Sequence, residues 1–195
     1  MDAASAEAHL QTIRTLMERA ALYRRALAPV MALLGAIGTL AAIGGYLLEI
    51  TSFPGFVTYW FSVGGMSVAA AFLLIRKQAL AAGEPFWSPP AKRVTQAILP
   101  PLVCGLALTA IAPGVWQATA LWAGLYGAAL HAGGFFTPGG IRRLGWLFIA
   151  AGVGIIVLLQ RGSLPGVHAH GAMGAIFGAL HLAYAAYLRV REQRS

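Results

Sequence analysis

The chain has 195 residues, of which 58% are hydrophobic and only 10% are charged. Soluble domains carry about 25% charged residues, and the apolar residues here stand in long blocks, so the composition excludes an ordinary soluble domain. The net charge of +8 does not indicate nucleic-acid binding, because the basic residues stand at the ends of the apolar blocks, where they act as topology signals and contact anionic lipid headgroups.

The first part of the chain, residues 1–25, is charged and has an amphipathic pattern. Its apolar residues fall on one helical stripe and its charged residues on the other side. We expect a helix that lies on the cytoplasmic membrane surface or against the helix bundle. A short oligomerisation coil is the alternative.

Six apolar blocks follow, and they predict an all-α integral membrane protein with a six-helix transmembrane domain over residues 26–188. The six predicted spans form three helical hairpins and are followed by a basic cytoplasmic tail, residues 189–195. Their expected bounds are about 26–48, 55–75, 97–113, 115–134, 144–160 and 171–188.

Two positions in these blocks leave alternatives open. Pro100 and Pro101 either mark the start of the third span or kink it. Glu49, the only carboxylate near a span, is either an interfacial residue or a proton or cation site.

The basic residues predict the orientation. With the N-terminus inside, every Lys and Arg except Arg161 falls on the cytoplasmic side. This agrees with the positive-inside rule for six spans with both termini cytoplasmic. We expect the bacterial cytoplasmic membrane, with anionic lipid headgroups as partners at that face and a homo-oligomer or a partner membrane subunit as possible assemblies.

The last block carries small residues and one histidine at helical spacing. Gly171, Gly174, Gly178, His181 and Ala185 are predicted to share one face, which would let another helix approach closely. The fourth block has a similar pattern, with Gly124 seven residues before His131. The similarity indicates either a duplicated hairpin or coincidence in a chain rich in Gly, Ala and Leu.

Polar groups inside the spans are the candidates for a site, because lipid offers them no partner. The predicted candidates for a polar path or ligand site are His131, His181, Tyr126, Ser67 and Glu49. The histidines could instead donate hydrogen bonds to a backbone carbonyl or to a tyrosine such as Tyr126 or Tyr184. They could also hold a proton, a metal or haem, although haem is not the favoured interpretation and the cofactor remains unknown.

A second histidine pair, His168 and His170, stands in the predicted outer loop 161–170. Alternate residues of an extended chain face the same way, so both could meet one metal ion. Only two ligands are visible, whereas zinc needs three or four.

The sequence does not favour an enzyme. It has no His-Glu-x-x-His, P-loop or dinucleotide motif, and the fourth span has no serine that could serve as a protease nucleophile. Our first hypothesis is a small channel, transporter or ligand-binding protein with a site near the histidines of spans four and six. The alternatives are a membrane scaffold or accessory subunit and, third, a haem-binding electron carrier.

Overall fold

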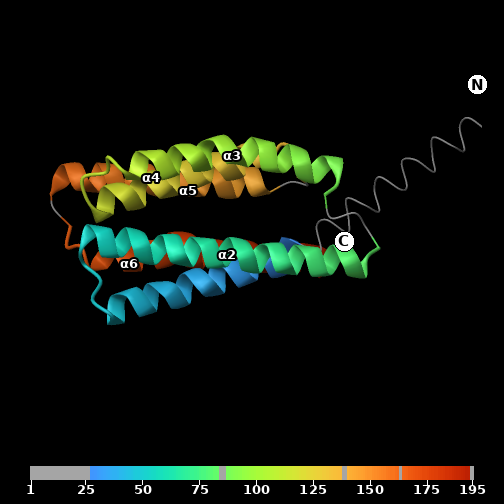
Figure 1. Cartoon of the computed structure of the whole chain (residues 1–195), viewed down its shortest axis with the longest axis horizontal. Coiled ribbons are helices and arrows are strands. Elements are labelled where there is room, and N and C mark those ends of the chain that lie inside the picture. The colour runs from blue at the N-terminus through green and yellow to red at the C-terminus, as the bar shows by residue number, and fades with distance from the viewer. Residues whose placement is uncertain (1–26, 84–86, 138–139, 163, 194–195) are drawn as a thin grey trace, which may run out of the picture.

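The computed structural model describes residues 27–83, 87–137, 140–162 and 164–193, and within these ranges it contains helices and no strand. The amphipathic helix expected at residues 1–25 lies outside them. The long helices in chain order are a first helix Leu27–Leu47, α2 Phe53–Ala81, α3 Pro89–Thr109, α4 Val115–Gly133, α5 Ile141–Arg161 and a last helix His168–Gln193 (Figure 1). The last helix consists of α6 His168–Met173, the π-helix η1 Gly174–Ala179 and α7 Leu180–Gln193.

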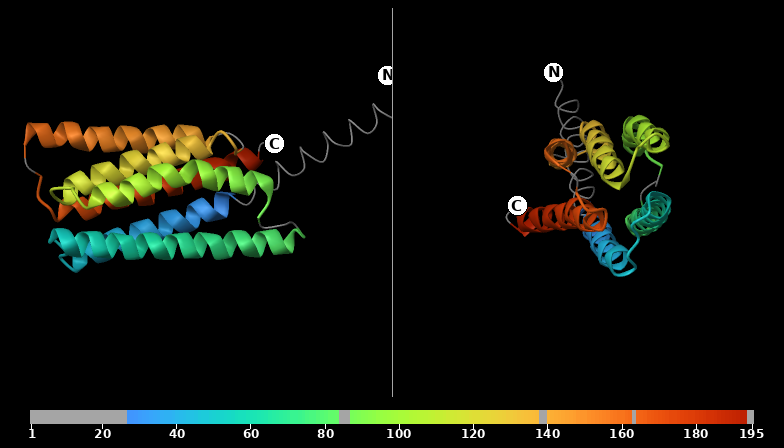
Figure 2. Two further views of the ribbon diagram at one scale, coloured as in Figure 1. Left: turned by 45° about the horizontal axis from the view of Figure 1, so that its top comes forward. Right: turned by 90° about the vertical axis from the view of Figure 1, so that its left-hand side faces the viewer.

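The helices run alternately up and down in one bundle (Figures 1 and 2). As a result, residues 48–52, 110–114 and 164–167 of the connections lie at one end, and residues 27 and 193 lie at the other end. Within the described ranges the basic residues other than Arg161 stand at or near this second end. They are Arg76, Lys77, Lys92, Arg93, Arg142, Arg143, Arg189 and Arg191.

Four helices are long and apolar enough to cross a membrane: the first helix, α2, α5 and the last helix. Many of their large apolar side chains are exposed; Leu47, for example, is 73% exposed and Val68 71%. Such surfaces are unfavourable in water and suit hydrocarbon. The chain is therefore a helical protein with the apolar helices of a membrane protein. α3 and α4 fall outside this set of four.

Several helices extend beyond the predicted spans. α2 includes residues on both sides of 55–75, α5 covers more than 144–160, and the last helix extends through Gln193, so most of the expected tail is helical. The physical reason is that backbone hydrogen bonding continues past the point where the side chains become polar.

The third helix differs most from the sequence prediction. α3 occupies Pro89–Thr109, whereas we expected 97–113, and Pro100 and Pro101 lie inside it. The interpretation of the double proline as the helix start is therefore wrong. Pro89, directly after the N-cap Ser88, begins the helix instead. Because proline has no N–H, the two internal prolines remove the hydrogen bonds that the carbonyls of residues 96 and 97 would accept.

Glycines allow α4 and α5 to pack with their backbones close together. A Cβ at Gly127 would lie 2.6 Å from the carbonyl oxygen of Gly145, and one at Gly152 would lie 2.7 Å from that of Ala120. The first and last helices meet in the same way, since a Cβ at Gly38 would lie 3.0 Å from the Phe177 carbonyl. Small residues provide close van der Waals packing that hydrophobicity cannot drive within lipid.

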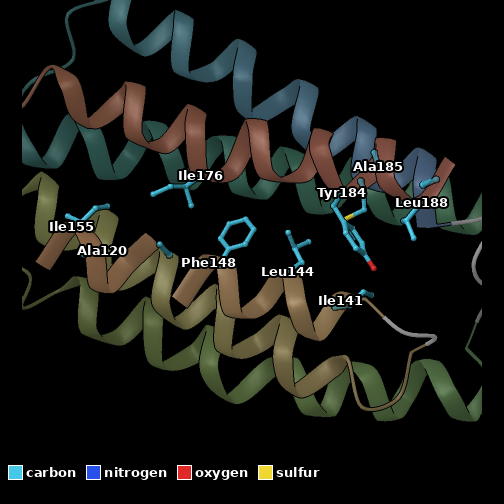
Figure 3. Packing of buried hydrophobic residues seen from close by; sticks show 12 residues of the cluster. Ala120, Ile141, Leu144, Phe148, Ile155, Ile176, Tyr184, Ala185 and Leu188 are labelled. Atoms are coloured by element: carbon cyan, nitrogen blue, oxygen red, sulfur yellow. The ribbon is translucent and has the colours of Figure 1, made fainter. Parts of the chain in front are cut away.

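The largest buried cluster joins the first helix, α4, α5 and the last helix. Phe148 of α5 is completely buried near the middle of this cluster. On its side toward the basic end lie Ile141, Leu144, Tyr184 and Leu188 (Figure 3). A second cluster at the opposite end contains Phe56 and Trp60 of α2 with Met173.

The residues of the expected stripe on the last helix do not all face the same helix. Gly174 and Gly178 face Ala42 and Thr39 of the first helix, whereas the ring of His181 contacts α4 and α5. Both glycines belong to η1, whose wider π turn changes the rotation per residue and so shifts the side chains that follow, including that of His181.

Candidate functional site

A cavity of about 370 Å³ lies midway along the bundle. Five helices contribute to its wall: the first helix, α2, α3, α4 and the last helix. Most of the lining is aliphatic or aromatic carbon, including Leu34, Phe61, Leu102 and Phe177. A space of this kind and size accepts a small apolar molecule rather than an ion.

The cavity reaches the outer surface of the bundle between α2 and α3. These two helices hardly touch one another, although α3 packs along α4 and α4 along α5. The cavity-lining residues Val68 of α2 and Leu106 of α3 are 71% and 61% exposed, respectively. In a bilayer this side of the bundle would face acyl chains rather than water.

Tyr126 and His181 form a hydrogen-bonded pair on the cavity wall. The Tyr126 hydroxyl lies 2.9 Å from Nε2 of His181, and Nδ1 of His181 lies 2.7 Å from the carbonyl oxygen of Phe177. His181 is only 2% exposed. The alternative in which His181 bonds to a backbone carbonyl is therefore confirmed, and Tyr126 is its second hydrogen-bond partner.

The proton positions of this pair follow from the partners. A carbonyl oxygen can only accept, so Nδ1 of His181 donates to Phe177. In the neutral ring Nε2 then carries no proton and accepts from the Tyr126 hydroxyl. The described residues contain two carboxylates, Glu49 and Glu192. Both are exposed and outside the cavity lining, so no described carboxylate stabilises a positive charge on the His181 ring.

The two indoles of the cavity wall direct their N–H groups elsewhere. Nε1 of Trp60 donates to Nδ1 of His170 at 3.1 Å, and Nε1 of Trp122 donates to Oγ1 of Thr109 at 2.8 Å. Thr109 in turn donates to the carbonyl of Gly105 at 2.7 Å. Both indoles therefore present ring carbon to the cavity.

The structure brings together three of the residues predicted for the site. Ser67, Tyr126 and His181 all line the cavity, Ser67 from the α2 side. His131 and Glu49 are not among the lining residues. His131, near the end of α4, packs against Trp146 and Phe135, and its Nδ1 has no hydrogen-bond partner. Glu49 is exposed in the turn after the first helix, with a φ of 50°.

His168 and His170 lie in a helix. The interpretation of 161–170 as a loop is wrong at its end, because α6 begins at His168. Residues two apart on a helix point in different directions, and here His168 is exposed whereas His170 is completely buried. Among the residues that the structure describes, no group of three or more His, Cys, Asp or Glu side chains could hold a metal ion.

Haem does not fit the His181 position. Both ring nitrogens of His181 are engaged, with Phe177 and Tyr126, so iron ligation would require one of these bonds to break. We therefore derive no function from haem.

Sequence reasoning missed Trp60, Trp122 and Gly105 as parts of the site. Neither tryptophan is part of a motif with known chemistry, and Gly105 is one of many glycines in the apolar blocks. A polar-aromatic pattern at helical spacing could have selected Trp122 and Tyr126, which are four residues apart on α4.

No known protein family matches the chain, and neither a curated protein nor a solved structure is significantly similar to it. The helices and the cavity thus define only a class: an all-helical protein with membrane-spanning character.

Proposed function

We propose that the protein is a six-span integral membrane protein that binds a lipophilic ligand in the cavity between α2 and α3. The observation that carries this proposal is the combination of an apolar cavity, an opening on the lipid-facing side and the Tyr126–His181 pair on the inner wall. A molecule dissolved in the bilayer could enter sideways without crossing water.

The length of each helix supports six spans. α4, the shortest of the six long helices, has 19 residues and α3 has 21, which at 1.5 Å per residue correspond to roughly 28 and 31 Å. These lengths suit a hydrocarbon core about 30 Å thick. Their alternating directions and the basic residues at one end favour cytoplasmic termini, anionic lipid at that face and, as we proposed from the sequence, a bacterial cytoplasmic membrane.

The character of the cavity favours binding over conduction. A water or ion path needs polar groups along its length, whereas most of the polar side chains here already have partners. Tyr126 and His181 bond to one another, for example, and Trp60 donates to His170. We therefore favour the ligand-binding form of the first hypothesis over a channel.

Single-cysteine labelling tests the topology. In a Cys104→Ala background, cysteines replace the exposed residues Thr51, at the outer end, and Ala82, at the basic end. A membrane-impermeant maleimide should label Thr51→Cys in intact cells and Ala82→Cys only after permeabilisation. Labelling of both positions from the same side would contradict six spans.

Fluorine NMR tests ligand binding. Each of the five tryptophans, labelled as 5-fluorotryptophan, gives its own signal. Adding 1-octanol to the protein in detergent micelles should shift the signals of Trp60 and Trp122, which line the cavity, more than those of Trp87, Trp116 and Trp146.

A matched pair of α2 variants provides the control. Ala71 lines the cavity and Ala69 is exposed outside it. Ala71→Phe should abolish the shifts, and Ala69→Phe should leave them unchanged. Equal shifts in both variants would contradict the site, and recovery of the chain only in a stoichiometric complex that blocks octanol would favour the scaffold alternative.

A further inference from the structure

The hydrogen bonds around the cavity determine which polar group of a ligand they can satisfy. The Phe177 carbonyl fixes the proton of His181 on Nδ1, and Nε2 then takes the proton of the Tyr126 hydroxyl. Tyr126 has no second proton to donate. What it retains is a lone pair on its oxygen, so the pair acts as a hydrogen-bond acceptor toward the cavity.

The other polar groups of the lining add little donor capacity. The indole protons of Trp60 and Trp122 are directed to His170 and Thr109, away from the cavity. Ser67 remains, with a hydroxyl that can both donate and accept. A ligand that can only accept therefore finds one donor, Ser67, whereas a ligand with a hydroxyl can donate to Tyr126.

We propose that the ligand is a lipophilic alcohol or phenol whose hydroxyl donates a hydrogen bond to Oη of Tyr126, with its apolar body lying between α2 and α3. This rests on the proposed ligand-binding function. The geometry favours one small molecule over a docked partner helix or a second copy of the chain. Such a helix would cover the opening near Val68 and Leu106, whereas the pair lies deeper, with His181 only 2% exposed.

The experiment compares two probes of equal chain length. 1-Octanol donates and accepts, whereas 1-methoxyoctane only accepts. Affinities are measured from the fluorine signals of Trp60 and Trp122 and expressed against the mole fraction of probe in the micelle, so that different partitioning does not affect the ratio. One hydrogen bond within a membrane protein corresponds to a preference of roughly fivefold for the alcohol.

Three variants locate this preference. The double variant Tyr126→Phe/His181→Leu removes the acceptor without leaving Nε2 of His181 as a substitute, and it should reduce the ratio to about one. Tyr59→Phe removes a hydroxyl that donates to the carbonyl of Ala41 outside the cavity lining, and it should keep the ratio. His181→Leu releases the Tyr126 proton for donation, so the ether should gain affinity while the alcohol changes little. This gain in affinity would also show that the His181→Leu variant is folded.

The outcomes separate the two proposals. If neither probe shifts Trp60 or Trp122 in the wild-type protein, the ligand-binding function itself is wrong. If both probes bind equally well, the proposed ligand binding is supported but the preference for a hydrogen-bond donor is wrong. A preference for the alcohol that persists in Tyr126→Phe/His181→Leu would overturn the role of Tyr126 as the acceptor.

Discussion

Two buried histidines on the last helix have opposite hydrogen-bonding arrangements. His170 accepts from Trp60 through Nδ1 and donates from Nε2 to the carbonyl of Ile50 at 2.8 Å. His181 donates from Nδ1 to its own helix and accepts from Tyr126 through Nε2. Their neutral rings are thus opposite tautomers.

The surroundings of the two rings differ just as much. Phe56, Tyr59 and Trp60 enclose His170, and their ring centroids lie 5.0 to 6.0 Å from its own. His181 borders the cavity. A buried imidazole with both nitrogens hydrogen-bonded can thus connect structural elements, as His170 does, or form part of a binding site, as we propose for His181. The presence of a cavity beside the ring distinguishes the two roles.

The largest effect is expected from His170→Ala. This change leaves a void among aromatic rings and removes the partners of the Trp60 N–H and the Ile50 carbonyl, so unfolding should become easier by about 3 kcal/mol. Reversible unfolding in mixed micelles measures it. His168→Ala, at an exposed position, is the control and should stay within about 0.5 kcal/mol of the wild type.

A smaller effect is expected from Gly45→Ala. The added Cβ would overlap the ring of His170, so the ring must move away from Trp60, at a cost of about 2 kcal/mol. The matched change is Gly65→Ala on α2, where a Cβ meets nothing within 4 Å. Higher helix propensity should make that variant equal to or more stable than the wild type. Equal destabilisation by both changes would contradict the close packing around His170.

Next in size is the loss of the Tyr126–His181 hydrogen bond. Tyr126→Phe should lower the free energy of unfolding by about 1 kcal/mol, because Nε2 of His181 loses its donor. The double variant with His181→Leu should be less destabilised than the sum of the single changes, since no unpaired group remains. Strict additivity would mean that the bond does not contribute to stability.

The smallest effect is expected from Ser67→Ala. The Ser67 hydroxyl makes no hydrogen bond to another described residue, so the free energy of unfolding should change by less than about 0.5 kcal/mol. The affinity for 1-octanol should fall less than in the double variant Tyr126→Phe/His181→Leu. A larger loss would make Ser67, rather than Tyr126, the principal polar contact.

Local patterns predicted much of the fold and part of the site. The long apolar blocks predicted the helices. The basic residues at the ends of these blocks, other than Arg161, lie together at one end of the bundle within the described ranges. The hydrogen bond between Tyr126 and His181 was one of the alternatives, because a buried imidazole in lipid needs a partner and the fourth block contains a tyrosine.

The cavity and the histidine environments could not be predicted. The opening exists because α2 and α3 do not pack closely, which depends on how whole helices arrange rather than on any local pattern. The burial of His170 depends on Trp60, 110 residues away in the chain. The π turn at Gly174–Ala179 has no clear sequence signal, yet it ends two residues before His181 and contains the two glycines that pack against the first helix.

The most direct measurement is the position of a heavy-atom ligand in crystals of the protein. Crystals grown with 8-bromooctan-1-ol and measured at the bromine absorption edge should show an anomalous peak between α2 and α3, with the ligand hydroxyl within hydrogen-bond distance of Oη of Tyr126. A bromine peak elsewhere on the bundle, or a hydroxyl turned away from Tyr126, would contradict the account.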